Sequence, residues 1–279
     1  MLRAGLSWLS RDHKLLANQL TARSGTLPDL GGVQENMPRL YLLDIEGTTS
    51  PMAFVYEALF PYARTRLAGY LANHSAEPEL LADLESLAGE NVRDLADGAP
   101  AIVGVAPTLP IDPETLRSCN AYLLWLMDRD RKSTALKSLQ GKVWASGYKA
   151  GELQGEVFPD VAPALERWHR TARVAIYSSG SVEAQKDLFK HTGFGDLTPL
   201  ISAYFDTRTG PKTDPGSYQK IADAMCIAAA ESVFVSDSPR ELDAARQAGM
   251  KTVLSIRPGN SPVESVQSHP VIRTFADLS

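Results

Sequence analysis

The stretch LYLLDIEGTTSP, residues 40–51, decides which fold we expect for this chain. Its mostly apolar run from Leu40 to Leu43 shows no polar alternation, which is typical of a strand buried on both faces of a parallel sheet. The run leads directly into two carboxylates, Asp44 and Glu46, and then breaks off in Gly-Thr-Thr-Ser-Pro. Two acids so close together repel each other, so their position at the end of a buried strand indicates a functional site.

Similar apolar runs recur along the chain and alternate with helix-like segments. The pattern predicts further strands at residues 173–177, 204–205, 233–235 and 252–256. This alternation is typical of α/β proteins. We therefore expect a Rossmann-like parallel sheet covered by helices.

A long interval separates the first two predicted strands. A crossover connection needs about 10 to 15 residues, whereas roughly 130 lie between Leu43 and Arg173, and they read as helices. We therefore predict an inserted helical cap at 52–157 and an α/β core at 37–51 and 158–279. Residues 1–36 form an N-terminal extension, which we interpret as a disordered tail or a misplaced start rather than as an organelle-targeting helix.

Composition limits the classes of partner that the protein can bind. The chain has 279 residues and a formal net charge of -5, without the basic excess that nucleic acid or an anionic membrane would require. No apolar stretch approaches the ~18 residues of a membrane span. Cys119 and Cys226 are far apart in sequence and form no C-x-x-C pair, so we expect both to be core residues in a reducing compartment. We expect a cytoplasmic monomer with no nucleic-acid or membrane partner.

Polar residues at other strand ends should meet Asp44, because the carboxyl ends of parallel strands share one edge of the sheet. Ser178 and Ser179 follow the second strand and precede a helix, an arrangement typical of anion sites. Asp237 follows the 233–235 strand, and Lys212 lies in the loop TRTGPKTDPGS. Each serine alone could be a helix cap, and the lysine alone a surface residue. Their joint position at one edge of the sheet favours a functional site.

The pattern Asp-x-Glu is a weak signal without its strand. It also occurs at Asp83, inside a helical pattern, and at Asp112, before a proline. We interpret both of these as solvated or capping carboxylates.

The predicted cluster fits phosphate chemistry. Several neighbouring carboxylates repel each other and repel a phosphate dianion, so a divalent cation is needed, and oxygen ligands point to Mg²⁺. With the cation and Lys212 neutralising charge, one carboxylate can attack phosphorus in line while another protonates the leaving oxygen.

These residues resemble a known family. The order D-x-[DE]-G-T, Ser/Thr, Lys and acid, each after a strand or in a following loop, is similar to that of the haloacid dehalogenase superfamily of aspartyl-phosphate-forming phosphatases. A narrower resemblance, to the enolase-phosphatases of methionine salvage, runs from about residue 39 to near the C-terminus. Its segments are LLDIEGTTSPMAFVYEALFPYAR, RKSTALKSLQGKVWASGYKAGEL, VAIYSSGSVEAQKDLF, YFDTRTGPKTDPGSYQKIA, FVSDSPREL and RPGN. Most superfamily members have Asp where this chain has Glu46.

The resemblance implies a role for each site residue. Asp44 would be the nucleophile and a Mg²⁺ ligand, Glu46 the acid/base with its carbonyl on the metal, Asp237 a metal ligand, Ser178 and Ser179 phosphate binders, and Lys212 a partner of both phosphate and Asp44.

The family's substrate is 2,3-diketo-5-methylthiopentyl-1-phosphate, which is enolised and then dephosphorylated to an acireductone. The base for the enolisation stays open between Glu46 and a cap residue. Three alternatives also stay open: a Mg²⁺-dependent phosphatase for another small phosphate ester, a halide-releasing hydrolase that needs no metal, and a domain of this fold that binds a ligand without catalysis.

Overall fold

The computed structural model describes residues 37–262 and 268–278, and the predicted extension over 1–36 lies outside the described residues. The chain divides into two compact units. One spans Leu59–Gly147, and the other comprises the described parts of Arg23–Ala58 and Tyr148–Ser279. The boundaries that we predict for the cap, 52 and 157, stay predictions.

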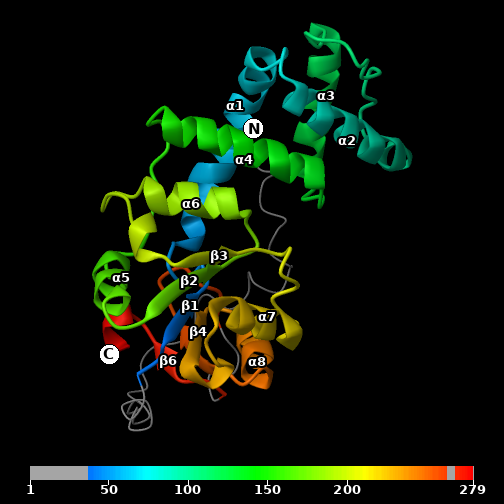
Figure 1. Cartoon of the computed structure of the whole chain (residues 1–279). Helices are drawn as coiled ribbons and strands as arrows, with labels where there is room; N and C mark the ends of the chain where they lie inside the picture. Colours follow the sequence, from blue (N-terminus) through cyan, green and yellow to red (C-terminus); the bar gives the residue numbers. More distant parts are fainter. Residues whose placement is uncertain (1–36, 263–267, 279) are drawn as a thin grey trace. The chain divides into compact units, whose positions relative to one another are not determined.

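The second unit contains a six-stranded sheet with helices (Figure 1). Its elements are β1 (Leu40–Leu43), α5 (Val161–His169), β2 (Arg173–Tyr177), α6 (Val182–Lys190), β3 (Ala203–Phe205), α7 (Pro215–Met225), β4 (Ser232–Ser236), α8 (Pro239–Gln247), β5 (Lys251–Ser255) and β6 (Val271–Ile272), with short 3₁₀ turns at Thr198–Leu200, Ala229–Glu231 and Phe275–Asp277.

The strand order is β3-β2-β1-β4-β5-β6, and each pair is parallel. This order confirms the predicted Rossmann-like α/β core. Leu43 at the end of β1 pairs with Ile176 of β2 and Val235 of β4, so the three strands end within one residue of each other. The order also adds β6, whose two residues are too few to form a hydrophobic pattern in the sequence.

Strand β1 is buried because both of its faces are covered (Figure 1). Leu40 and Leu42 belong to one apolar cluster with residues of α7 and α8. Tyr41 points to the other face, where its ring stacks on Trp168 of α5 at 4.2 Å between centroids. Alternating residues thus pack on opposite helix layers, which explains why the run LYLL has no polar position.

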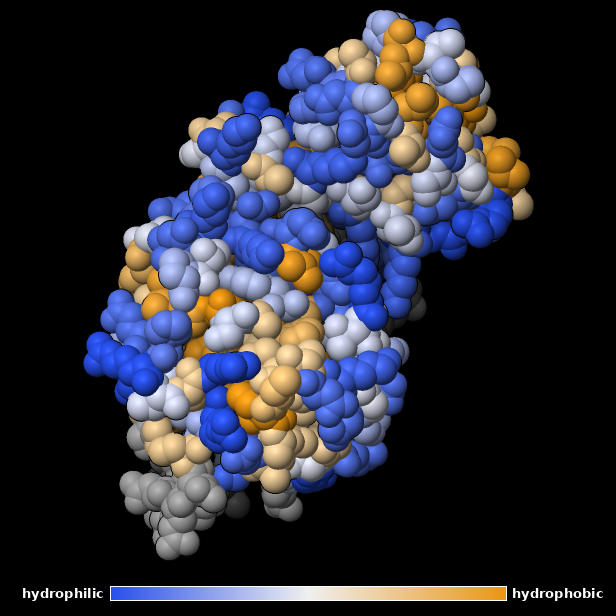
Figure 2. All heavy atoms as spheres, viewed as in Figure 1, coloured by the Kyte–Doolittle hydropathy of each residue, from blue (hydrophilic) through white to orange (hydrophobic). Residues whose placement is uncertain are grey.

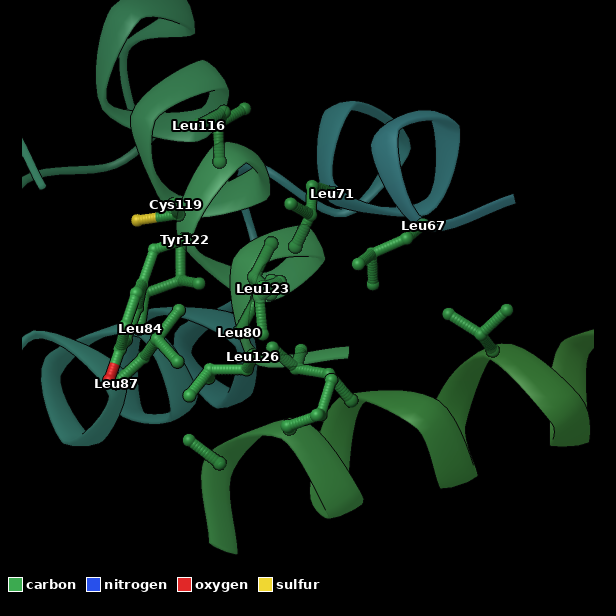
Figure 3. Packing of buried hydrophobic residues seen from close by; sticks show 14 of the residues in the cluster. Leu67, Leu71, Leu80, Leu84, Leu87, Leu116, Cys119, Tyr122, Leu123 and Leu126 are labelled. Carbon is green, nitrogen blue, oxygen red and sulfur yellow. The ribbon is translucent and has the colours of Figure 1, made fainter. Parts of the chain in front are cut away.

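The Leu59–Gly147 unit is helical. It holds α1 (Phe60–Asn73), α2 (Pro78–Asp94), a 3₁₀ turn (Leu95–Asp97), α3 (Pro113–Asp128) and most of α4 (Thr134–Lys149), and a π-helical turn (Phe54–Leu59) leads into it. Figure 3 shows the leucines of these helices meeting in one apolar core. On α2 the buried Leu80, Leu84 and Leu87 recur at helical spacing, which places them on a single face.

The two cysteines differ from each other. Cys119 is fully buried in this helical core, as expected, and burial raises the pKa of its thiol (Figure 3). The prediction that Cys226 is a core residue is wrong, because Cys226 is exposed. Cys226 ends α7 in the left-handed conformation, with φ of 53°, and so stands outside the helix face that packs on the sheet.

Most of the visible surface is hydrophilic, and hydrophobic residues form separate patches (Figure 2). Within the described part of the chain, no helix is both long and apolar enough to span a membrane.

Asp160 fastens the C-terminal segment to the α/β core. Its Oδ2 accepts hydrogen bonds from Arg257 (2.8 Å), Thr274 Oγ1 (3.0 Å) and the Phe275 amide (2.5 Å). Burial alone would raise the pKa of this carboxyl, but these donors outweigh it and lower the pKa. The ionised form therefore contributes stability above its ordinary pKa of about 4, and this stability is lost as the pH falls through the lowered pKa.

We expect Asp160→Asn to lower the free energy of unfolding by about 2–4 kcal/mol near neutral pH, because one charged acceptor serves three donors. The difference from the unchanged protein should shrink in acid, as the pH falls below the ordinary pKa of about 4 and through the lowered pKa of Asp160. Urea unfolding at neutral pH and in acid measures it. A difference that is the same at both would contradict this role.

Candidate active site

Asp44 lies directly after the central strand β1, and its side chain is buried. Its Oδ1 accepts hydrogen bonds from the Ile45 amide (2.8 Å) and from Lys212 Nζ (2.5 Å). Its Oδ2 accepts one from Ser236 Oγ (3.0 Å). A carboxylate fixed in this way at the end of a strand is held in one orientation, as a nucleophile must be.

Lys212 is the cation of the cluster. Its buried ammonium lies 2.5 Å from Asp44 Oδ1 and 2.7 Å from Glu241 Oε2. Burial would lower the pKa of Lys212, but the carboxylates of Asp44 and Glu241 outweigh burial and raise it. Lys212 therefore stays charged throughout the physiological range.

The loop that carries Lys212 is fixed through its backbone. The hydroxyls of Tyr177, Ser217 and Tyr218 donate to three successive carbonyls, those of Gly210 (2.9 Å), Pro211 (2.8 Å) and Lys212 (2.6 Å). Because the backbone is held at each of these residues, the ammonium has little freedom to leave Asp44.

Glu46 and Ser178 meet although 132 residues separate them. Ser178 is the residue after β2, and its Oγ donates a hydrogen bond to Glu46 Oε2 at 3.2 Å. Burial, together with the neighbouring Asp44 carboxylate, raises the pKa of Glu46. A glutamate with a raised pKa can hold a proton near neutral pH and donate it to a leaving group.

Asp237 follows β4 and faces the same cluster. Burial, with the carboxylates of Asp44 and Glu241, raises its pKa to about 7. Asp237 Oδ2 also lies against Gly47, where a Cβ would collide with it. In the described part of the chain, no hydrogen bond or ion pair joins the Asp237 carboxylate to another residue, so its oxygens are open to a ligand.

Ser179 and Ser181, which follow Ser178 in the sequence SSGS, have different surroundings. Ser179 is exposed, and no contact among the described residues joins it to the Asp44 cluster. Ser181 caps α6, since its Oγ accepts a hydrogen bond from the Ala184 amide at 3.2 Å. The capping explanation therefore holds for Ser181.

Sequence analysis assigned no role to Glu241 or Ser236, which both belong to the cluster. Ser236 Oγ lies 3.0 Å from Asp44 Oδ2 and 3.1 Å from Glu241 Oε2, and its single hydrogen can be donated to one of them at a time. Burial and the Asp44 carboxylate raise the pKa of Glu241. No local signal identifies Glu241 in the sequence, because an acid in the first turn of a helix is common.

The loop Asp44–Ser50 satisfies its backbone carbonyls with one exception. Within the part of the chain that the structure describes, the Glu46 carbonyl accepts no hydrogen bond. The other acceptors and their donors are Asp44 with Thr49 Oγ1, Ile45 with the Thr48, Thr49 and Ser50 amides, Gly47 with Asn260 Nδ2, Thr48 with Arg257 Nε, Thr49 with the Phe158 amide, and Ser50 with the Gly47 amide. The backbone carbonyl oxygen of Glu46 is therefore free to bind a ligand near the carboxylates of Asp44 and Asp237.

The other two Asp-x-Glu occurrences are structural. Asp83 pairs with Lys142 at 2.6 Å, and Asp112 caps α3 by accepting from the Glu114 amide at 2.8 Å. The capping interpretation is confirmed for Asp112, whereas Asp83 is neither a cap nor solvated, because its side chain is mostly buried against Lys142.

The central strand of the parallel sheet ends in Asp44, with Lys212 and Asp237 close to it. The family model of haloacid dehalogenase-like hydrolases matches residues 38–249, so the chain is a hydrolase of that class. The solved structure of UTR4 from Saccharomyces cerevisiae superposes with a TM-score of 0.68 at 34% identity, covering 86% of this chain and 99% of that one.

Curated relatives narrow the class. Enolase-phosphatase E1 of Synechococcus elongatus is 49% identical over 238 residues, which cover 85% of this chain and 96% of the relative. Enolase-phosphatase E1 of Sorangium cellulosum is 44% identical over 245 residues, which cover 86% and 97%. The chain therefore belongs to the Enolase-phosphatase E1 family of the haloacid dehalogenase-like hydrolases.

Proposed function

We propose that this protein converts 2,3-diketo-5-methylthiopentyl-1-phosphate, through its enol, to the acireductone and phosphate in methionine salvage, with Asp44 as the nucleophile. The observation that carries the proposal is the buried Asp44 carboxylate, held by Lys212 Nζ at 2.5 Å, with Glu46, a second carboxyl of raised pKa, two residues further on. One group of this pair can attack phosphorus while the other moves a proton.

The oxygen donors support a magnesium site. The Asp44 and Asp237 carboxylates and the free Glu46 carbonyl would hold the ion, a donor set of the hard oxygen type that Mg²⁺ prefers. No group of three or more His, Cys, Asp and Glu side chains that could hold a metal occurs among the described residues. The proposed Mg²⁺ ligands do not require three such side chains, because the third ligand is the backbone carbonyl oxygen of Glu46. Bound Mg²⁺ would neutralise phosphoryl charge and polarise a carbonyl.

Phosphoryl transfer then follows from the chain's own groups. An Asp44 oxygen attacks phosphorus, the bond from phosphorus to the substrate C1 oxygen breaks, and protonated Glu46 gives its proton to that oxygen. In the second step the Glu46 carboxylate takes a proton from water, whose oxygen attacks phosphorus and frees Asp44 and phosphate. Lys212 and Ser178 bind the phosphoryl oxygens, and Ser179 supports them from the same turn.

Enolisation precedes this step in the proposal. A base removes a proton from C1, and the C2 oxygen gains one, which gives the enol without a change in oxidation state. Glu46 is our hypothesis for the base, because its carboxyl lies in the cluster beside Asp44 and a carboxylate with a raised pKa is a stronger base.

We expect Glu46→Gln to lower both enol formation and phosphate release about 10²- to 10⁴-fold, since the amide can neither accept nor donate the proton. Ultraviolet absorbance of the enol and a phosphate assay, followed in one reaction, measure the two steps separately. If phosphate release is lost while the enol still accumulates, Glu46 is not the enolisation base.

The decisive test of the function is steady-state turnover of the diketo phosphate with Mg²⁺, again with both signals. We expect enol followed by phosphate, and loss of both after chelation with EDTA. Good activity on generic phosphate esters without turnover of the diketo phosphate would overturn the assigned substrate and leave a general phosphatase. Halide release that is insensitive to EDTA would favour the hydrolase without metal.

The proposed enzyme is a monomer in the cytoplasm. The described groups of the cluster come from a single chain, so no second copy is needed to assemble them. Sedimentation of the purified full chain tests the first point, and fractionation of cells that express it tests the second.

A further inference from the structure

The segment Arg257-Pro258-Gly259-Asn260, which we call the RPGN segment, follows β5 and has no part in the chemistry above. Arg257 is buried, with its guanidinium near the rings of Phe158 and Phe275, 4.7 and 4.6 Å from their centroids. A buried guanidinium is costly unless it is hydrogen-bonded. Its partners therefore indicate what it holds in place.

Both ends of the RPGN segment contact the loop Asp44–Ser50, which we call the nucleophile loop. Asn260 Nδ2 donates to the Gly47 carbonyl at 2.9 Å, and Arg257 Nε donates to the Thr48 carbonyl at 3.1 Å. Arg257 is anchored in turn by Asp160 Oδ2 and by the Arg273 carbonyl, at 2.8 and 2.9 Å. Two adjacent carbonyls of the loop are thus tied to a fixed point in the core.

These two carbonyls immediately follow the free carbonyl of Glu46. Gly47 has a φ of 71°, and a Cβ there would lie 2.9 Å from Asn260 Oδ1 and collide with Asp237 Oδ2. The backbone at Gly47 therefore passes so close to Asn260 and Asp237 that a side chain has no room there. A rotation of the Gly47 or Thr48 peptide would move the Glu46 oxygen relative to the Asp44 and Asp237 carboxylates.

We propose that Arg257 and Asn260 are positioning residues, which hold the Gly47 and Thr48 carbonyls so that the Glu46 carbonyl stays directed at the cation site. The inference rests on the proposed Mg²⁺ site. Residues that orient metal ligands typically contribute about 10- to 100-fold to metal affinity.

The test measures Mn²⁺ binding directly, from the electron paramagnetic resonance signal of the free ion, on the full chain without substrate. We expect Asn260→Ala to weaken Mn²⁺ binding about 10- to 100-fold. Excess metal should restore its kcat, which a general folding defect would not allow. The matched control is Asn91→Ala in the helical unit, which also loses an amide donor to a distant carbonyl, that of Pro100 at 2.9 Å. It should bind Mn²⁺ like the unchanged protein.

A second pair of variants keeps the inference testable if Asn260→Ala does not fold. Arg257→Lys retains the charge beside Asp160 and loses the Nε donor to Thr48, so we expect weaker Mn²⁺ binding. Its control is Arg167→Lys. In the unchanged protein, the Arg167 guanidinium donates to the Phe275 and Leu278 carbonyls, both at 2.9 Å, and not to the nucleophile loop.

Two failures can be told apart. If the unchanged protein binds Mn²⁺ but the Asn260 and Arg257 variants bind it equally well, the positioning role is wrong and the metal site stands. If the unchanged protein does not bind Mn²⁺, the proposed metal-dependent function itself is wrong.

Discussion

Replacing Asp44 with asparagine should lower phosphate release about 10⁴- to 10⁶-fold, the size of effect seen when a covalent nucleophile is removed. Asparagine has nearly the same shape, but its amide cannot form the acyl phosphate. It also places an NH₂ group or a neutral oxygen against Lys212 Nζ, which now lies 2.5 Å from a carboxylate. Phosphate released from the diketo phosphate in Mg²⁺ measures the loss.

Asp206 provides the control for Asp44. It is also a buried aspartate directly after a strand, β3, but its Oδ2 pairs with Arg208 at 2.8 Å and not with Lys212. We expect Asp206→Asn to lower stability and to leave phosphate release close to normal. An Asp44→Asn protein that still releases phosphate at a rate close to that of Asp206→Asn would show that the nucleophile lies elsewhere.

Replacing Lys212 with methionine is expected to have the second largest effect. The change leaves Asp44 and Glu241 as buried carboxylates without the ammonium that now lies 2.5 and 2.7 Å from them. Removal of one partner from a buried ion pair typically costs about 3–5 kcal/mol of stability. Loss of the cation that faces the phosphoryl group should lower kcat about 10³- to 10⁵-fold. Urea unfolding and phosphate release measure the two effects.

A double variant separates charge balance from catalysis. Adding Glu241→Gln to Lys212→Met removes one of the two unpaired carboxylates, so we expect part of the stability to return while activity stays low. Lys142→Met is the control for activity, because Lys142 forms a pair of similar length, 2.6 Å, with Asp83 in the helical unit, although its side chain is more exposed than that of Lys212. Normal kcat in Lys212→Met would contradict a catalytic role for Lys212.

The sequence allowed prediction of those site residues that follow a recognisable strand. Asp44, Ser178 and Asp237 each come directly after a buried apolar run, and parallel strands bring such positions to one edge. Lys212 lacks a strand of its own, but the structure places it at the same edge. Strand β6 escaped prediction because two residues carry no periodicity.

Residues whose role depends on distant contacts could not be predicted. Glu241 looks like an ordinary acid in the first turn of a helix, where such residues favour the helix dipole, and only the fold brings it to Lys212. Asn260 contacts Gly47 from 213 positions away, and no local pattern encodes that contact. Cys226 was misplaced because its exposure depends on the left-handed end of α7, which its residue type does not indicate.

Trapping the protein during turnover shows whether Asp44 accepts the phosphoryl group. The full chain is mixed with the diketo phosphate and Mg²⁺, quenched in acid within the first turnover, digested and examined by mass spectrometry. Phosphate carried on Asp44, appearing before free phosphate and absent from Asp44→Asn, is the predicted result. Release of phosphate at normal speed with no phosphorylated Asp44, or with the label on another residue, would contradict the account.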